Sequence, residues 1–417
     1  MSHDGKEPGP PGRRVHEIDV LRGFSLLGIL FVNALMMAGP YLALGGGPQA
    51  SGADRVAAWL TTALVSAKFY PLFAFLFGYS FVLQMRSAER AGAAFAPRHL
   101  RRVAGLFGIG LAHAVLLYPG DILTAYAALA LVLYGLRGLT PRTAVRLAVG
   151  LVAVLSLLLL GHGLLTVATT LPMTPEQYAP LVADTIAARR GGVLSVVGAH
   201  LHDLPATLEA NLLYAPQMLA AFLAGLAAAK SGLLERRARD RRWLRRTLVR
   251  WLPLGLAGSV ATAVCANGPL DSRWFLTGHA IAVLTGPALT ASYVCGLLLL
   301  LHPRGRAAAV LAAAGRMALT HYLTQSLVLA LVFTGYGLGL YDRVGAAAVL
   351  AGCVVLYGVQ LAVGARLMAR TRYGPAELVL RTLTSGRRPG RDTASPAAHP
   401  EAVPPSDGPR TGPRPVR

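Results

Sequence analysis

Long runs of apolar residues alternate with short polar spacers along the chain. Ten runs are long enough to form a membrane-spanning helix or most of one, because about 20 apolar residues cross a bilayer as an α-helix. The pattern predicts an all-α fold, a polytopic integral membrane helix bundle of about ten transmembrane helices. The runs are Ile18 to Ala38, Ala57 to Met85, Val103 to Leu117, Ile122 to Leu136, Ala144 to Leu165, Leu208 to Ala229, Leu252 to Ala266, Thr277 to Leu301, Ala307 to Phe333 and Gly345 to Ala365.

The composition agrees with a membrane protein and excludes several other classes. Hydrophobic residues make up 54% of the 417 residues and charged residues only 14%, whereas about 25% is usual in soluble proteins. A soluble enzyme, a disordered chain and a disulfide scaffold are therefore excluded for the body of the protein. Cys265, Cys295 and Cys353 each stand alone in an apolar run, which predicts packing residues, with neither a bridge nor a metal site.

The positive charges predict the orientation of the helices. The formal net charge is +21, and 33 of the 40 Lys and Arg residues fall in alternate spacers and at the two ends of the chain. Cytoplasmic loops carry such an excess. We therefore expect a multi-pass protein of the plasma membrane with both termini in the cytoplasm. The pattern favours membrane lipids as partners and no nucleic acid.

The spacers divide the chain into five parts. The basic spacer is the boundary between two membrane parts, and both ends are polar. The tail is rich in Pro, Ser, Arg and Ala, a composition too polar to pack. The parts are a cytoplasmic N-terminal segment (1–17), a six-helix membrane part (18–229), a basic cytoplasmic loop (230–250), a four-helix membrane part (251–385) and a disordered cytoplasmic tail (386–417).

One outer loop, at about 167–207, is much longer than the others. Loops of this length are often functional, so we interpret it as a lid or an acceptor-binding surface. It contains His200, His202 and Asp203. Further ligands at a suitable spacing are missing, so an ordinary polar surface is favoured over a metal site.

Ionisable residues inside the apolar runs are the strongest functional candidates, because burying them in hydrocarbon is costly unless they face a partner or a cavity. His113 lies just before the predicted turn at residues 118–120 and Asp121 just after it, which places both near the outer face. A neutral histidine can accept a proton from a hydroxyl or amine, and a carboxylate can orient its ring. The alternative is structural: His113 bonds a neighbouring helix and Asp121 caps its own helix.

Other polar residues of the apolar runs also have two interpretations each. Asn33 stabilises a reacting oxyanion or bonds a neighbouring helix, and Lys68 stabilises the oxyanion or extends outward to water. His279 is placed near the outer face. His321 and Gln325 are four residues apart and form one polar helix face, which lines a cavity or joins two helices.

Three arginines, Arg22, Arg102 and Arg316, are placed near the inner face. Arg22 follows Asp19 by three residues, which permits a local ion pair. Anchoring at the membrane interface is one interpretation. The other is that the three guanidinium groups bind the phosphates of a cytosolic donor, because a guanidinium matches phosphate geometry.

Six sequence blocks resemble the YeiB-like family of bacterial multi-pass membrane proteins. They cover most of residues 13–385 in the order typical of that family, and the last three look like its characteristic C-terminal domain. The blocks are Ile18 to Asn33, Lys68 to Gly78, His113 to Leu123, Gly315 to Gln325, Gly335 to Gly339 and Tyr373 to Glu377.

Through this family the chain is similar to the transmembrane acyltransferase group, which includes heparan-α-glucosaminide N-acetyltransferase and membrane glycan O-acyltransferases. The resemblance implies transfer of an acyl group from cytosolic acyl-CoA to an acceptor across the membrane. In the heparan enzyme an asparagine that matches Asn33 takes part in catalysis with a histidine of the following outer loop. Residues 39–55 of this chain contain no histidine, so His113 is assigned to that role.

The resulting hypothesis is a membrane-integral acyltransferase with acyl-CoA (acetyl-CoA) as donor and a hydroxyl- or amine-bearing small molecule or glycan as acceptor. The alternative is a transporter or exporter of a small metabolite, and a non-catalytic membrane interaction protein is the third interpretation. Self-association into a homo-oligomer is left open. The assigned residues are His113, Asp121, Asn33 and Lys68 for catalysis, Arg22, Arg102 and Arg316 for the donor, and His279, His321 and Gln325 for the acceptor.

Overall fold

The computed structural model of the protein describes residues 16–40, 50–172, 174–301 and 305–385, and all regular secondary structure in these ranges is helical. The N-terminal segment up to residue 15 and the tail 386–417 lie outside the described residues. Within the described ranges, seven helical segments are long and apolar enough to cross a membrane. The predicted polytopic helix bundle is therefore confirmed, while the count of ten and the cytoplasmic termini stay predictions.

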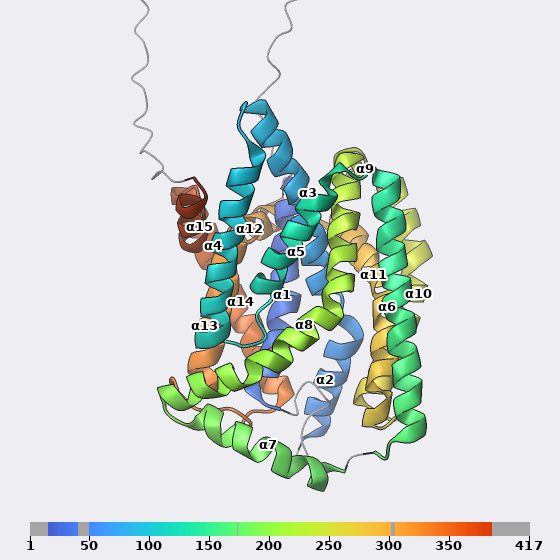
Figure 1. Ribbon diagram of the computed structural model, residues 1–417, viewed down its shortest axis with the longest axis vertical. Helices are drawn as coiled ribbons and strands as arrows, with labels where there is room; N and C mark the ends of the chain where they lie inside the picture. Colours follow the sequence, from blue (N-terminus) through green and yellow to red (C-terminus); the bar gives the residue numbers. More distant parts are fainter. Residues whose placement is uncertain (1–15, 41–49, 173, 302–304, 386–417) are drawn as a thin grey trace, which may run out of the picture.

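The helices form one elongated bundle in which α9 and α15 lie at one end and α7 lies across the other (Figure 1). Helix α1 is central and packs on α3, α12, α13 and α14, while α6, α10 and α11 form a second group that α8 joins. The helices are α1 (His16–Ala38), α2 (Gly52–Leu64), α3 (Phe69–Arg90), α4 (Phe95–Leu116), α5 (Leu123–Gly135), α6 (Pro141–Thr169), α7 (Pro175–Arg190), α8 (Val193–Lys230), α9 (Leu233–Arg237), α10 (Arg241–Asn267), α11 (Phe275–Leu300), α12 (Arg306–Arg316), α13 (Ala318–Phe333), α14 (Ala346–Arg370) and α15 (Pro375–Ser385).

Glycines allow the central helices to touch backbone to backbone. A Cβ at Gly78 of α3 would lie 2.1 Å from the carbonyl oxygen of Phe222, and a Cβ at Gly225 of α8 would lie 2.0 Å from that of Phe75. Helices α1 and α12 meet in the same way at Gly23 and Gly315. Small residues at such contacts are typical of membrane bundles, where dispersion contacts hold helices together. The three cysteines are buried, as predicted for packing residues.

Two of the predicted spans are interrupted. The segment Ala57 to Met85 is divided between α2 and α3 at residues 65–68, and Pro71 stands in the first turn of α3, where a missing N–H costs no helical hydrogen bond. The segment Ala307 to Phe333 is divided between α12 and α13 at Met317. Its prediction as one continuous helix is wrong, because apolar content sets where a chain enters a membrane and not whether its backbone turns inside the bundle.

Two predicted loops are largely helical. The outer segment 167–207 contains α7 and the first part of α8, which runs on without a break to Lys230, with Pro205 and Pro216 inside it. The basic segment 230–250 contains α9 and the first turns of α10. The polar composition of these segments is typical of loops, but tertiary contacts and capping residues such as Asp240, which accepts from the Trp243 N–H at 3.0 Å, allow helices there.

The packing of α3 on α8 predicts the effect of enlarging Gly225. Gly225→Leu places side-chain atoms inside the α3 backbone, so we expect a loss of about 1–3 kcal/mol, as is typical of overpacking, measured as a lower thermal unfolding midpoint in detergent. Gly161→Leu is the control, because Gly161 is exposed on α6 and a Cβ there would meet no atom within 4 Å. Equal midpoints for the two variants would contradict the packing.

Candidate functional site

His113 and Asp121 form a buried pair beside the turn that joins α4 to α5. The Nδ1 of His113 lies 2.9 Å from Oδ1 of Asp121, and both side chains are only 1% exposed. The other carboxylate oxygen, Oδ2, accepts a hydrogen bond from the Thr124 N–H at 2.8 Å. The sequence left open whether Asp121 caps its own helix or lies against the His113 ring. In the structure Asp121 caps α5 and also faces that ring.

Both ring nitrogens of His113 are buried, and neither makes a hydrogen bond to a described residue. The 2.9 Å approach of Nδ1 to Asp121 is a close ion-pair contact, and Nε2 is the nitrogen away from the carboxylate. Gly110, one turn before His113, makes room for the pair, because a Cβ there would lie 2.8 Å from Oδ2 of Asp121. The tight approach of α4 to the start of α5 thus keeps the carboxylate beside the ring. A neutral histidine with a carboxylate beside one of its nitrogens is suited to proton transfer.

Helix α13 supplies a tyrosine that sequence reasoning did not assign. The Tyr322 hydroxyl lies 3.5 Å from Oδ1 of Asp121, and its ring centroid lies 4.9 Å from that of His113. From α8, the Asn211 amide donates to the backbone oxygen of Asp121 at 3.3 Å. Tyr322 follows His321 directly, but it looks like an ordinary interfacial aromatic residue in the sequence. Only its contacts with His113 and Asp121 in the folded protein identify it.

The segment between α6 and the middle of α8 covers this pair. His200 is 1% exposed and its Nδ1 lies 3.1 Å from the Val115 carbonyl oxygen, so the prediction of a polar surface is wrong for His200. Arg189 of α7 pairs with Asp203 of α8, and its guanidinium lies over the Tyr341 ring at 5.3 Å. No group of three His, Cys, Asp or Glu side chains placed to hold a metal ion occurs in the described part of the chain.

Two acidic groups with a raised pKa lie in the turn between α4 and α5 and in the loop that follows α13. Burial raises the pKa of Tyr118 to about 12, although the nearby Arg189 charge opposes this shift. Burial also raises the pKa of Asp342, against the charge of Arg190. The phenol of Tyr118 therefore stays protonated at neutral pH and can only donate or accept a hydrogen bond.

Lys68 and His279 form a second polar cluster near the break between α2 and α3. Lys68 is 1% exposed and its Nζ donates to the Thr62 carbonyl oxygen at 3.0 Å, so the interpretation that it extends to water is wrong. The lysine charge lies close enough to interact with His279, whose ring packs on Tyr214 at a centroid distance of 4.7 Å. No hydrogen bond or ion pair within the described ranges joins Lys68 to His113 or Asp121.

The polar face of α13 is used for helix packing. The Gln325 amide donates to Oε1 of Gln360 on α14 at 2.8 Å, and the Gln360 amide donates to Thr324 Oγ1 at 2.8 Å. His321 is 3% exposed and its Nε2 has no hydrogen-bond partner among the residues that the structure describes. Of the two interpretations of this face, the structure supports the one in which Gln325 joins two helices. Asn33 stands apart from these bonds, half-buried on α1.

The three predicted donor-binding arginines gather around α1 at the end of the bundle where α15 lies. Arg22 pairs with Asp19 at 3.0 Å, as predicted, and donates to Ser80 on α3. Arg102 of α4 lies close enough to interact electrostatically with Arg22. Arg316 follows Gly315, which touches Asp19, and its Nε is buried without a hydrogen-bond partner among the described residues. The cluster carries an excess of positive charge.

Glu377 of α15 caps the interrupted helix next to these arginines. Its Oε1 accepts from the N–H groups of Leu319 and Thr320 at 2.7 and 3.1 Å, and its Oε2 accepts from the Thr320 hydroxyl at 2.6 Å. These bonds satisfy donors that the break at Met317 leaves free, and the carboxylate also complements the positive end of the helix. In the sequence, Glu377 belongs to the block Tyr373 to Glu377, one of the blocks that carry the family resemblance.

We expect Glu377→Ala to destabilise the protein by about 0.5–2 kcal/mol, the usual cost of removing a helix cap, measured as a lower thermal unfolding midpoint in detergent. Glu377→Gln keeps an acceptor oxygen and should lose less. Glu89→Ala provides the matched control, since Glu89 is exposed on α3 and its side chain makes no hydrogen bond or ion pair to any described residue. An unchanged midpoint in Glu377→Ala would rule out the capping role.

Comparison with known proteins shows which family the chain resembles. Residues 228–387 match the family described as "Protein of unknown function (DUF418)". The uncharacterized protein YxaH of Bacillus subtilis (strain 168) is 32% identical over 406 residues, which cover 91% of this chain and 96% of YxaH.

Two further relatives are similar over nearly their whole lengths. An uncharacterized 39.9 kDa protein from the amylase 3′ region of Bacillus acidopullulyticus is 28% identical over 377 residues, which cover 90% of this chain and 95% of the relative. The uncharacterized protein YeiB of Escherichia coli (strain K12) is 27% identical over 388 residues, with coverage of 88% and 95%. The resemblance seen in the sequence blocks is confirmed: the chain belongs to the YeiB-like, DUF418-containing family.

Proposed function

We propose that the protein is an acyltransferase of the bacterial inner membrane that transfers an acyl group from cytosolic acyl-CoA to a hydroxyl or amine near the outer face. The buried His113–Asp121 pair carries this proposal, because its carboxylate faces one ring nitrogen and the other nitrogen has no partner in the described part of the chain. Such an arrangement activates hydroxyl nucleophiles in many transferases and hydrolases.

The transfer step needs one general base and one hydrogen-bond donor to the oxyanion that forms at the thioester carbonyl. His113 Nε2 takes the proton of the acceptor O–H or N–H, and the acceptor atom attacks the thioester carbonyl carbon. The C–S bond then breaks, the new C–O or C–N bond remains, and the leaving thiolate takes the proton from His113. Asp121 stabilises the imidazolium between these two transfers. The half-buried amide of Asn33 is the candidate donor to the oxyanion, and Lys68 is placed with His279 instead.

The arginine cluster suits the phosphate end of the donor. Arg22 pairs with Asp19, and Arg102 interacts electrostatically with Arg22 and Glu377. The buried Nε of Arg316 has no hydrogen-bond partner among the described residues and is a donor that an anion could satisfy. On two helices, a predicted donor-binding arginine and a predicted catalytic residue are separated by the same number of residues. Arg22 and Asn33 on α1 are 11 residues apart, and so are Arg102 and His113 on α4. That interval spans about 16 Å of helix. The extended arm that joins the phosphates of coenzyme A to its thiol has a similar length.

The proposal predicts that the arginine cluster is needed to bind the donor and that His113 is needed only for transfer. In purified protein, Arg102→Ala should weaken acetyl-CoA binding roughly tenfold or more, because it removes a charged hydrogen-bond donor. His113→Ala should bind acetyl-CoA normally but lose transfer of a radiolabelled acetyl group to a panel of sugars and amines by roughly 10²–10⁴-fold. Calorimetry and product counting measure the two effects separately.

His162→Ala is the matched control for His113→Ala, because His162 is exposed on α6 and should leave both measurements unchanged. Failure of the well-folded wild-type protein to bind acetyl-CoA, or full transfer by His113→Ala, would exclude the mechanism.

Transport of a small metabolite is the second candidate, and the two interrupted helices favour it. Many transporters bind substrate where membrane helices are broken. Here Lys68, with Nζ on the Thr62 carbonyl oxygen, lies at the break between α2 and α3. Uptake of a metabolite into proteoliposomes without covalent change, reduced in Lys68→Met and unaffected in His113→Ala, would support transport over acyl transfer.

A further inference from the structure

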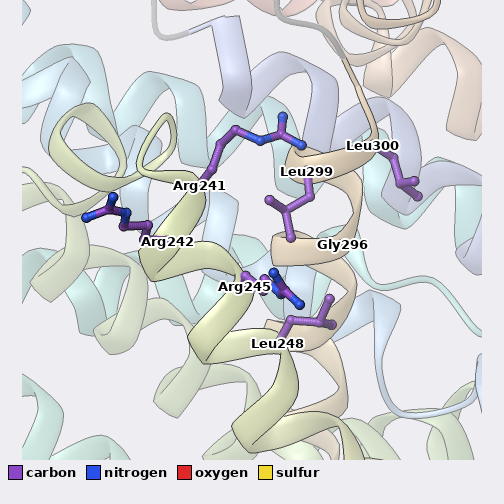
Figure 2. Close-up of a pocket in the computed structure, with 7 residues that line it drawn as sticks. All are labelled: Arg241, Arg242, Arg245, Leu248, Gly296, Leu299 and Leu300. Carbon is purple, nitrogen blue, oxygen red and sulfur yellow. The ribbon is translucent and has the colours of Figure 1, made fainter.

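A groove lies between the basic start of α10 and the end of α11, away from the clusters described above. Its volume is about 630 Å³, and it is lined by Arg241, Arg242, Arg245, Leu248, Gly296, Leu299 and Leu300. On α10 the residues Arg241, Arg245 and Leu248 follow helical spacing and so share one face. Figure 2 shows Arg241 extending from α10 toward the leucines of α11, with Arg245 and Leu248 below it.

The groove arginines have no acidic partner among the described residues. Arg237 and Arg239, just before them in the chain, pair with Asp240 and Glu17. Arg241, Arg242 and Arg245 make no ion pair or side-chain hydrogen bond with any described residue, and no acidic side chain lines the groove. Unpaired guanidinium groups that line one concave surface favour an anion with several acceptor oxygens, such as a phosphate group.

The rest of the groove is apolar and open. Leu248, Leu299 and Leu300 line it, and Leu300 is 85% exposed. A Cβ added at Gly296 would meet no atom within 4 Å, so the α11 wall is open there. The ligand that fits therefore has an anionic head and an apolar remainder. A soluble phosphate compound would leave the leucine wall uncovered, whereas an acyl chain would bury it.

The position of the groove fits a lipid at the membrane boundary. Helix α10 is one of the helices long and apolar enough to span a membrane, and its first ten residues include five arginines. This end of α10 follows α9, at the end of the bundle that the charge pattern predicts to be cytoplasmic (Figure 1). The boundary between arginines and leucines in the groove then coincides with the boundary between lipid headgroups and acyl chains, where clustered arginines bind anionic lipids.

We propose that the α10–α11 groove is a specific binding site for one anionic phospholipid, with its phosphodiester on Arg241 and Arg245 and an acyl chain along Leu248, Leu299 and Gly296. Arg242 contributes at the rim. This site does not depend on acyl transfer, because none of its residues belongs to the His113–Asp121 pair or to the cluster of Arg22, Arg102 and Arg316.

Native mass spectrometry of the purified, delipidated protein in detergent, titrated with phosphatidylglycerol and separately with phosphatidylcholine, tests the site. We expect the wild-type protein to bind one phosphatidylglycerol at least tenfold more tightly than phosphatidylcholine. The double variant Arg241→Gln/Arg245→Gln should lose that preference. Gly296→Phe should weaken binding of phosphatidylglycerol comparably by filling the groove, with no change of charge.

Arg246→Gln is the matched control, because Arg246 is exposed on the same turns of α10 and does not line the groove. It should change the affinity less than twofold, and every variant is compared only if its thermal unfolding midpoint matches that of the wild-type protein. Equal binding of the two lipids, equal losses in Arg246→Gln and the double variant, or unchanged binding in Gly296→Phe would overturn the proposal. Displacement of the lipid by equimolar glycerol 3-phosphate would assign the groove to a soluble phosphate compound instead.

Discussion

Backbone contact at two pairs of glycines is the constraint on which the rest of the structure depends. Gly23 and Gly315 bring α1 against α12, and Gly78 and Gly225 bring α3 against α8. The first contact joins the N-terminal and C-terminal membrane parts, and it sets Arg316 beside the turn of α1 that carries Asp19 and Arg22. A side chain at any of the four positions would overlap main-chain atoms, which have no rotamer with which to yield.

The interrupted helices show how the bundle satisfies polar backbone groups away from water. An unpaired N–H or C=O in an apolar environment costs several kcal/mol, so each break needs a nearby polar partner. Glu377 from α15 supplies acceptors to the first N–H groups of α13, and the buried amine of Lys68 donates to the Thr62 carbonyl oxygen near the end of α2. Both residues belong to blocks by which the sequence resembles the YeiB-like family, and both bond backbone groups next to a helix break.

Sequence reasoning located the main polar residues better than it described their surroundings. His113 and Asp121 are predicted from their positions on either side of a turn, and the local ion pair of Arg22 with Asp19 from their spacing; both contacts are present. Tyr322 and Gln360 could not be predicted as partners, because their distances along the chain from Asp121 and Gln325 carry no pairing signal. The outer segment was predicted as a loop because it is polar, yet α7 and α8 bury His200 and Arg189 there.

The sequence by itself determined the membrane class, the all-helical fold and the family, because apolar periodicity, low charge and ordered motif blocks are local properties that one chain displays directly. Only the tertiary structure decided which polar residues meet. The helix break at Met317, the continuation of α8 through the outer segment, and the electrostatic interaction of Arg102 with Arg22 all depend on packing between segments far apart in the chain. The energy of such contacts comes from close approach and from satisfied hydrogen bonds, and neither is recorded in the order of residues along one segment.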